Sequence, residues 1–82
     1  MAVSEREILD GLAEIINEET GLDTGSIRLG KRFADDLSID QSLMAVIIEQ
    51  VATKFRVPVP PAAAARFVKV GDAVAYIQAA QG

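Results

Sequence analysis

The chain contains no cysteine, no histidine and no tryptophan among its 82 residues. Without cysteine it can form neither a disulfide framework nor a thiolate nucleophile or thiolate metal site. Without histidine it has no imidazole ligand and no Ser–His or Cys–His pair. Because the side chains of the commonest catalytic sites are missing, we do not expect this protein to be an enzyme.

Long apolar runs and clustered positive charge are also missing. No apolar run approaches the roughly 18 residues that a membrane-spanning helix needs. The first residues do not resemble a signal peptide, since residues 1–3 lead directly into Ser4-Glu5-Arg6-Glu7. The net charge is −4 and the basic residues are scattered, which argues against nucleic-acid binding. We therefore expect a cytoplasmic protein without a membrane span.

The composition is typical of one small folded domain. Half of the residues are apolar and 24% are charged, which separates the chain from disordered tails. A chain of this length has room for one hydrophobic core, so we expect a single domain over residues 1–82. Charge is uneven along the chain, because residues 1–40 carry ten of the twelve acidic side chains.

The first helix is predicted over Glu5–Thr20. Ser4 and Glu7 form the signature of a capping box, in which the serine hydroxyl accepts from the Glu7 amide. Apolar residues then recur at three- and four-residue spacing until Gly21 ends the pattern. Residues 21–39 lose this period, and we expect a long loop there, of a length that is often functional or contains a short helical turn.

The second helix, near Gln41–Phe55, is predicted to be the central one. Its apolar stripe has strict four-residue spacing at Leu43, Ile47, Val51 and Phe55. On a helix of about 100° per residue, Ser42 and Val46 fall on the opposite face and should point to solvent. We expect Asp36 or Asp40 to cap this helix.

The C-terminal third contains a proline connector and two further helices. Residues 57–61 read Val-Pro-Val-Pro-Pro, which is a stiff extended segment. A short third helix is predicted over residues 62–67 and a fourth from Val70 to near Ala80. The predicted fold class is all-α: a small four-helix bundle with three longer helices, one short third helix and a long loop between the first two.

Two segments are specific enough to indicate a family. Residues 33–40 read Phe-Ala-Asp-Asp-Leu-Ser-Ile-Asp, and residues 70–77 read Val-Gly-Asp-Ala-Val-Ala-Tyr-Ile. The chain resembles an acyl carrier protein over almost its whole length, most closely those of actinobacterial type II fatty-acid and polyketide systems. The resemblance implies that a serine at the start of the second helix receives 4′-phosphopantetheine from coenzyme A. Acyl intermediates then travel as thioesters on the thiol of this group.

The chain departs from the family motif at the attachment position. The motif is Asp-Ser-Leu, whereas this chain reads Asp40-Gln41-Ser42-Leu43-Met44. Without a gap, Gln41 occupies the modified position and the core positions up to Phe55 are kept. With a shift of one residue, Ser42 supplies the serine, but a compensating deletion is needed before Phe55. Ser42 beside Asp40 is the candidate attachment site.

The resemblance also implies an acyl-chain cleft and a partner surface. The cleft candidates are Ile47, Ile48, Val51, Phe55, Phe67 and Ile77, although for each of them the ordinary role of a core residue is the favoured interpretation. The partner-surface candidates are Leu43, Val46, Glu49, Lys54 and Arg56. Family members usually present several glutamates on this surface, but Glu49 is the one acid between Gln41 and Lys69. We therefore expect a partner different from the ordinary enzymes of fatty-acid synthesis.

Two functions remain open, and we favour the first because an intact approach to the attachment site has little structural reason to persist alone. In the first, a phosphopantetheinyl transferase modifies Ser42, and the carrier serves acyl-processing enzymes. In the second, the domain has lost the prosthetic group and binds an unknown protein partner through the apolar patch around Val46. A buried Ser42 hydroxyl, or one held in a tight cap, would exclude the first function. We predict no metal site, since Asp35, Asp36 and Asp40 lack the ligand pattern of a calcium loop.

Overall fold

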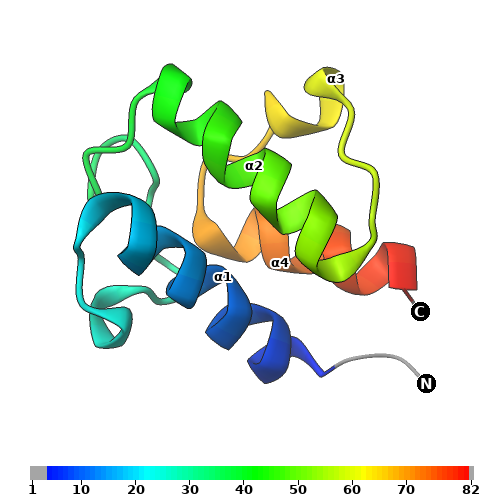
Figure 1. Cartoon of the computed structure of the whole chain (residues 1–82), viewed down its shortest axis with the longest axis horizontal. Helices are drawn as coiled ribbons and strands as arrows, with labels where there is room; N and C mark the ends of the chain where they lie inside the picture. The colour runs from blue at the N-terminus through cyan, green and yellow to red at the C-terminus, as the bar shows by residue number, and fades with distance from the viewer. Residues whose placement is uncertain (1–3, 82) are drawn as a thin grey trace.

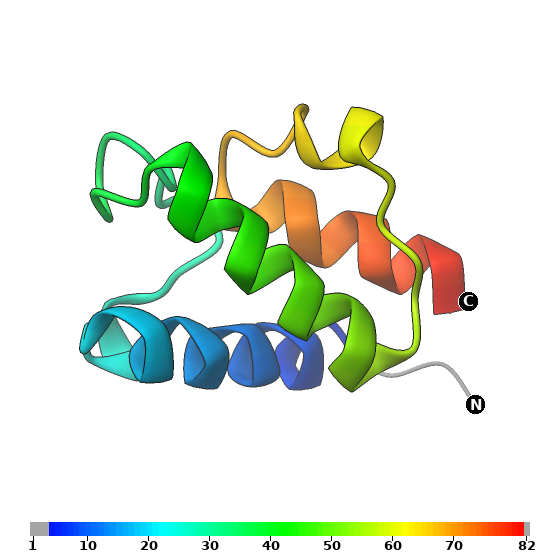
Figure 2. The same cartoon turned by 45° about the horizontal axis from the view of Figure 1, so that its top comes forward.

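The four predicted helices all form in the computed structural model, which describes residues 4–81. They are α1 (Glu5–Thr20), α2 (Gln41–Phe55), α3 (Pro61–Ala64) and α4 (Val70–Gln81), and a short 3-10 helix, η1 (Thr24–Ser26), lies in the long loop. Helix α1 packs against both α2 and α4. Figure 1 and Figure 2 show α2 between α1 on one side and the short α3 on the other.

Local caps fix both ends of α1. The Ser4 hydroxyl oxygen accepts from the Glu7 amide at 3.2 Å, and the Ser4 hydroxyl donates to the Glu7 carboxylate at 3.3 Å. At the other end Gly21 has φ +79°, and its amide donates to the Asn17 carbonyl at 2.8 Å. Glycine adopts this left-handed conformation at little cost, which explains why the helix ends there.

The long loop is fixed by buried side chains and by backbone hydrogen bonds. Ile27, Phe33, Leu37 and Ile39 are buried in the core. The Phe33 amide donates to the Val68 carbonyl at 3.0 Å, next to an isolated antiparallel bridge between Arg32 and Lys69. The loop between α1 and α2 is therefore attached to the segment that precedes α4.

Asp40, rather than Asp36, caps α2. The Asp40 carboxylate accepts from the Leu43 amide at 2.8 Å. The Asp36 carboxylate accepts instead from the Arg32 amide at 2.8 Å, inside the loop. Helix α2 ends where Arg56 takes a left-handed conformation with φ 56°.

The predicted bounds of the third helix were wrong. It covers Pro61–Ala64 rather than residues 62–67. Pro61 fits the first helical position because its missing amide needs no partner there. After Ala64 the hydrogen bonds span three residues. The Arg66 amide donates to the Ala63 carbonyl at 3.0 Å, and the Phe67 amide donates to the Ala64 carbonyl at 3.1 Å. These three-residue hydrogen bonds are those of a 3-10 turn, not of an α-helix.

The core lies between α1, α2 and α4. Its largest fully buried side chains are Ile8, Leu12, Ile16, Ile47, Val51, Val70, Val74 and Ile77. Each aliphatic side chain of this kind contributes about 1.5–3 kcal/mol when it is removed from water. Within residues 4–81, no helix is long and apolar enough to cross a membrane.

The α3 segment is held to α4 by aromatic side chains. The rings of Phe67 and Tyr76 meet edge to face, with centroids 5.6 Å apart and an interplanar angle of 62°. The Tyr76 hydroxyl donates to the Pro58 carbonyl at 3.4 Å. At the other end of the connector, the Gln81 amide group donates to the Phe55 carbonyl at 3.1 Å, which joins the last turn of α4 to the end of α2.

Candidate functional site

The start of α2 presents Gln41 and Ser42 to solvent. Both side chains are exposed, and they occupy the first two positions of the helix. The capping bond is made by Asp40, so the Ser42 hydroxyl is not needed as a cap. No side-chain hydrogen bond of the described residues involves the Ser42 hydroxyl. The condition that would exclude modification, a buried or tightly capped hydroxyl, is therefore not met.

Gln41 and Ser42 point in different directions from α2. The two residues differ by a rotation of about 100° around the helix axis. Gln41 lines a groove between α2 and α3, whereas Ser42 does not. Ile47 and Val51 face the core, as the ungapped alignment expects, and the buried Ile48 lines the groove. The hydroxyl of Ser42 thus starts from the outer face of α2, one residue after Gln41 of the groove lining.

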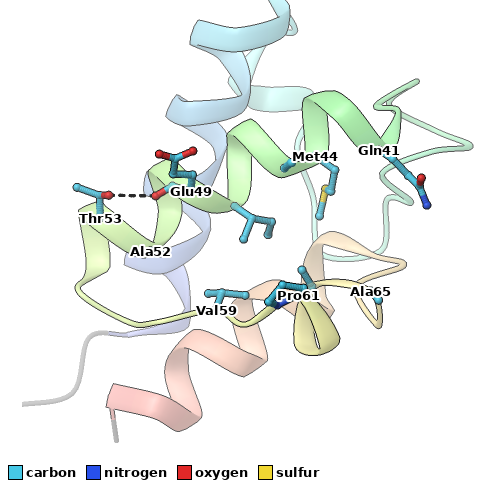
Figure 3. A pocket seen from close by; sticks show the side chains of 11 residues that line it. Gln41, Met44, Glu49, Ala52, Thr53, Val59, Pro61 and Ala65 are labelled. Carbon is cyan, nitrogen blue, oxygen red and sulfur yellow. Dashed lines mark hydrogen bonds between the residues drawn. The ribbon is translucent and has the colours of Figure 1, made fainter.

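The groove is apolar and has a volume of about 660 Å³. Figure 3 shows Met44 on one wall, from α2, and Val59 and Pro61 on the other. The residues that line it are Gln41, Met44, Ala45, Ile48, Glu49, Ala52, Thr53, Val59, Pro61, Ala64 and Ala65. The Thr53 hydroxyl donates to the Glu49 carbonyl at 3.1 Å, so it is satisfied within the helix. Only the Gln41 and Glu49 side chains bring further polar groups to this surface.

A smaller hollow adjoins the groove at the start of α2. Its volume is about 250 Å³, and Gln41, Met44, Ala64 and Ala65 line both spaces. Phe67 contributes to the wall of this hollow. The two spaces together follow α2 from its first turn to its last.

The six predicted cleft residues occupy three different environments. Ile48 lines the groove and Phe67 lines the adjoining hollow. Three others, Ile47, Val51 and Ile77, are fully or almost fully buried in the core. The ring of Phe55 lies over Gly11 of α1, where a Cβ atom would come within 2.6 Å of its Cζ atom.

Sequence reasoning missed the small residues of the groove. Ala52, Val59 and Ala64 line it, together with Met44, but none of them was a cleft candidate. A signal was present in the four-alanine run of residues 62–65, which directly follows Pro60-Pro61. Methyl side chains on a short helix cannot fill the space beside a neighbouring helix, so they leave a depression there.

The predicted partner-surface residues differ in exposure and pairing. Val46 is 41% exposed on the outer face of α2, and Glu49 is exposed one turn further along. Leu43 is half-buried against the core. The Lys54 ammonium lies 3.8 Å from the Glu14 carboxylate of α1, and Arg56 is exposed at the end of α2.

The three loop carboxylates each have a separate structural role. Asp36 and Asp40 accept from backbone amides, and the Asp35 carboxylate lies 3.5 Å from the Arg32 guanidinium. In the part of the chain that the structure describes, no three carboxylates are grouped so that they could hold a metal ion.

Comparisons with known proteins point to one family. Residues 10–77 match the family described as "Phosphopantetheine attachment site". The chain is 56% identical over 81 residues to an acyl carrier protein of Beutenbergia cavernae, covering 99% of each chain. It is 53% identical over 79 residues to an acyl carrier protein of Kineococcus radiotolerans, covering 96% of this chain and 98% of the other. Both likenesses extend over nearly all of the sequence.

The fold has a solved counterpart. An acyl carrier protein from Enterococcus faecalis superposes with a TM-score of 0.79 at 22% identity, over 95% of this chain and 99% of that one. At this identity the likeness supports the four-helix fold. It agrees with the helix order predicted from the sequence.

One side chain at the start of α2 has the chemical group that attachment of this family's prosthetic group needs. Phosphopantetheine is attached through a phosphodiester, which needs a hydroxyl, and Gln41 offers an amide instead. Ser42 offers an exposed hydroxyl at the next position. When bound, the group supplies the thiol that this cysteine-free chain lacks. The chain therefore belongs to the acyl carrier protein family, whose members are non-enzymatic carriers of acyl groups that work with acyl-processing enzymes through covalently attached 4′-phosphopantetheine.

Proposed function

We propose that Ser42 is the attachment residue, one position later than in the family motif. The chain is then a single carrier domain over residues 1–82 that acts in the bacterial cytoplasm with a phosphopantetheinyl transferase and acyl-processing enzymes. The observation that carries this proposal is the exposed Ser42 hydroxyl in the first turn of α2, with the cap supplied by Asp40.

The electrostatics of the first turn favour a phosphate at Ser42. The first amides of a helix have no partner inside the helix, and the positive end of its dipole lies among them. The Asp40 carboxylate accepts from the Leu43 amide, and the Asp40 carbonyl accepts from the Met44 amide, both at 2.8 Å. A phosphodiester on Ser42 would lie beside the remaining amides of this turn, an arrangement that stabilises anions.

The groove supports the acyl-carrying part of the proposal. Its walls are formed mainly by Met44, Ile48, Ala52, Val59 and Pro61, so it suits a hydrocarbon chain. Burial of each methylene group stabilises such a chain by about 0.8 kcal/mol. From Ser42 on the outer face, the arm has to pass Gln41 to bring its acyl group to the groove.

Intact-mass measurement tests the attachment site. The chain is incubated with coenzyme A and a broad-specificity phosphopantetheinyl transferase. We expect one phosphopantetheine on the natural sequence and none on Ser42→Ala. Ser38→Ala is the matched control, because Ser38 is also exposed and lies only four residues earlier. Modification of Ser42→Ala, or no modification of the natural sequence, would contradict the proposal.

A double variant tests the register of the site. Gln41→Ser combined with Ser42→Ala places the hydroxyl at the family position and leaves the Asp40 cap in place. If this variant accepts the group while the natural sequence does not, the transferase requires the family register and the natural chain is a carrier-like domain without the group. If both accept it, their relative rates measure the cost of a rotation of about 100° around the helix.

The groove can be tested by filling it. Ala52→Phe places a ring between α2 and α3, and we expect long acyl chains to stabilise this variant less than they stabilise the natural chain. The measurement is the rise in thermal midpoint on loading with acyl groups of increasing length. Ala79→Phe, at an exposed position of α4 outside the groove, is the control. If the thermal midpoint of Ala52→Phe rises with the length of the acyl group as that of the natural protein does, the acyl group lies outside the groove.

A further inference from the structure

The two walls of the groove are joined to each other at one end. Helix α2 ends at Phe55, and residues 56–58 lead the chain back to Val59 on the opposite wall. The last α2 residue of the lining is Thr53. Figure 3 shows the chain turning back beyond Thr53 and returning along the groove through Val59 and Pro61. We call the end of the groove at Thr53 and Val59 the closed end.

Hydrogen bonds from α4 fix the turn beyond the closed end. The Gln81 side-chain amide donates to the Phe55 carbonyl at 3.1 Å, just before the turn. The Tyr76 hydroxyl donates to the Pro58 carbonyl at 3.4 Å, at its last residue. Between them the Val57 side chain is buried in the core. Because these contacts hold the turn on both sides, the closed end cannot widen unless they break.

The opposite end of the groove is open. Gln41, Met44, Ala64 and Ala65 line both the groove and the hollow at the start of α2, so the space continues there. Figure 3 shows Gln41 and Ala65 at this end, away from the turn. Ser42 lies in the same first turn of α2. An acyl group carried on Ser42 would enter from the open end, with its last carbon atoms toward the closed end.

The length of the groove can be derived from α2. The α2 part of the lining is a single stripe, with a residue at every third or fourth position from Gln41 to Thr53. At about 1.5 Å per residue, the stripe is about 18 Å long from Gln41 and about 14 Å long from Met44. An extended saturated chain advances about 1.25 Å per carbon atom, given C–C bonds of about 1.5 Å and angles of about 111°. The groove therefore has the length of about 11 to 14 carbon atoms.

We propose that the closed end limits the acyl group that the groove can shelter to a saturated chain of about 11 to 14 carbon atoms. Chains up to this length lie wholly between the walls, and the additional carbon atoms of longer chains remain in water. The terminal carbon has to be uncharged, because the walls are mostly apolar and the Glu49 carboxylate lies beside them. This inference rests on the proposed acyl-carrying function of the groove, but not on attachment at Ser42.

Binding without covalent attachment tests the length limit. The isotope-labelled Ser42→Ala chain is titrated with saturated acyl-coenzyme A thioesters of increasing length, and the amide signals of the groove residues report the dissociation constant. Affinity should rise about fourfold with each added methylene group, and should level off at about 11 to 14 carbon atoms. Affinity that keeps rising beyond this length, or that does not depend on length, would overturn the proposal.

The outcome is separate from that of the attachment test, because Ser42→Ala cannot receive phosphopantetheine at this position. Levelling off at the expected length, together with no added mass on the natural chain, would refute attachment at Ser42 and leave the length limit standing. Added mass on the natural chain, together with affinity that keeps rising, would refute the length limit alone.

Two leucine variants locate the limit within the groove. Thr53→Leu fills the closed end and should move the levelling-off to shorter chains by up to one helical turn, or about four carbon atoms. Ala45→Leu is the matched control, since Ala45 is also an exposed lining residue of α2 but lies near the open end. It should leave the length at which affinity levels off unchanged. Leucine is a good helix former at both positions. If Thr53→Leu levels off at the same length as the natural chain, the closed end does not set the limit.

Discussion

Asp40 caps α2, so the hydroxyl of Ser42 is not needed for this structural role. Its carboxylate accepts from the Leu43 amide, and its carbonyl accepts from the Met44 amide, both at 2.8 Å. The first turn of α2 is therefore closed without any contribution from Ser42. Serine is a good cap only at the N-cap position, which Asp40 occupies, and the Ser42 side chain is exposed two residues further on.

Asp40→Ala tests this division of roles. Loss of the cap should lower the free energy of unfolding by about 1 kcal/mol, as at other capped helices. Asp40→Asn should lose less, because its amide oxygen can still accept from Leu43. Urea denaturation gives the comparison, with Asp35→Ala as the control for loss of a nearby exposed carboxylate. Equal losses in Asp40→Ala and Asp35→Ala would mean that the cap contributes nothing measurable.

Helices α1 and α2 approach closely because Gly11 has no side chain. The ring of Phe55 occupies the space that a Cβ atom would take, and the Lys54 side chain lies 3.0 Å from the same point. Polar contacts continue along this side of α1, where Gln50 donates to Glu19 and Lys54 pairs with Glu14. The end of α2 is thus held against the middle of α1.

Gly11→Ala should therefore destabilise the protein. In an exposed helix interior this change stabilises by about 1 kcal/mol, but here the Phe55 ring has to move, and overpacking costs about 1–3 kcal/mol. We expect a net loss of about 1 kcal/mol in urea denaturation. In a Phe55→Leu background most of this loss should disappear, since the two positions are coupled. A stabilising Gly11→Ala in the natural sequence would show that the ring moves freely.

The bounds of α1 and α2 could be predicted from sequence because their ends are encoded locally. Ser4, Gly21 and Asp40 each fix a helix end through contacts within five residues. The end of α3 could not be predicted, because residues 65–67 are compatible with an α-helix as well as with the 3-10 turn that they form. The groove was missed for a related reason. Four of its lining residues are alanines, whose importance lies in the space that they leave.

The distribution of charge over the protein is unfavourable at low salt. Helix α1 alone carries Glu5, Glu7, Asp10, Glu14, Glu18 and Glu19, and its single basic residue is Arg6. Asp10 pairs with Arg6 at 3.9 Å and Glu14 with Lys54 at 3.8 Å, but all four side chains are well exposed. Such surface pairs contribute little. The remaining carboxylates repel one another.

Added sodium chloride should therefore raise the thermal midpoint. At about 0.01 M salt the screening length is about 30 Å, comparable to the extents of 32 × 26 × 20 Å. At about 0.15 M it falls to about 8 Å, and most of the repulsion is removed. We expect a rise of about 2–4 °C by calorimetry, corresponding to about half a kcal/mol for a domain of this size. Glu18→Gln removes one of the repelling carboxylates and should reduce this rise. A fall of the thermal midpoint with added salt would show instead that the ion pairs dominate.

Tyr76 gives the protein a built-in optical probe. It is the single tyrosine of a chain without tryptophan, so almost all near-ultraviolet absorption and emission originates from this ring. The ring contacts Phe67 and its hydroxyl reaches the Pro58 carbonyl, at the two ends of the segment that forms one wall of the groove. A movement of that wall, as entry of an acyl chain into the groove would require, would change the environment of Tyr76. The opening of the groove can thus be followed by tyrosine fluorescence in the unlabelled protein.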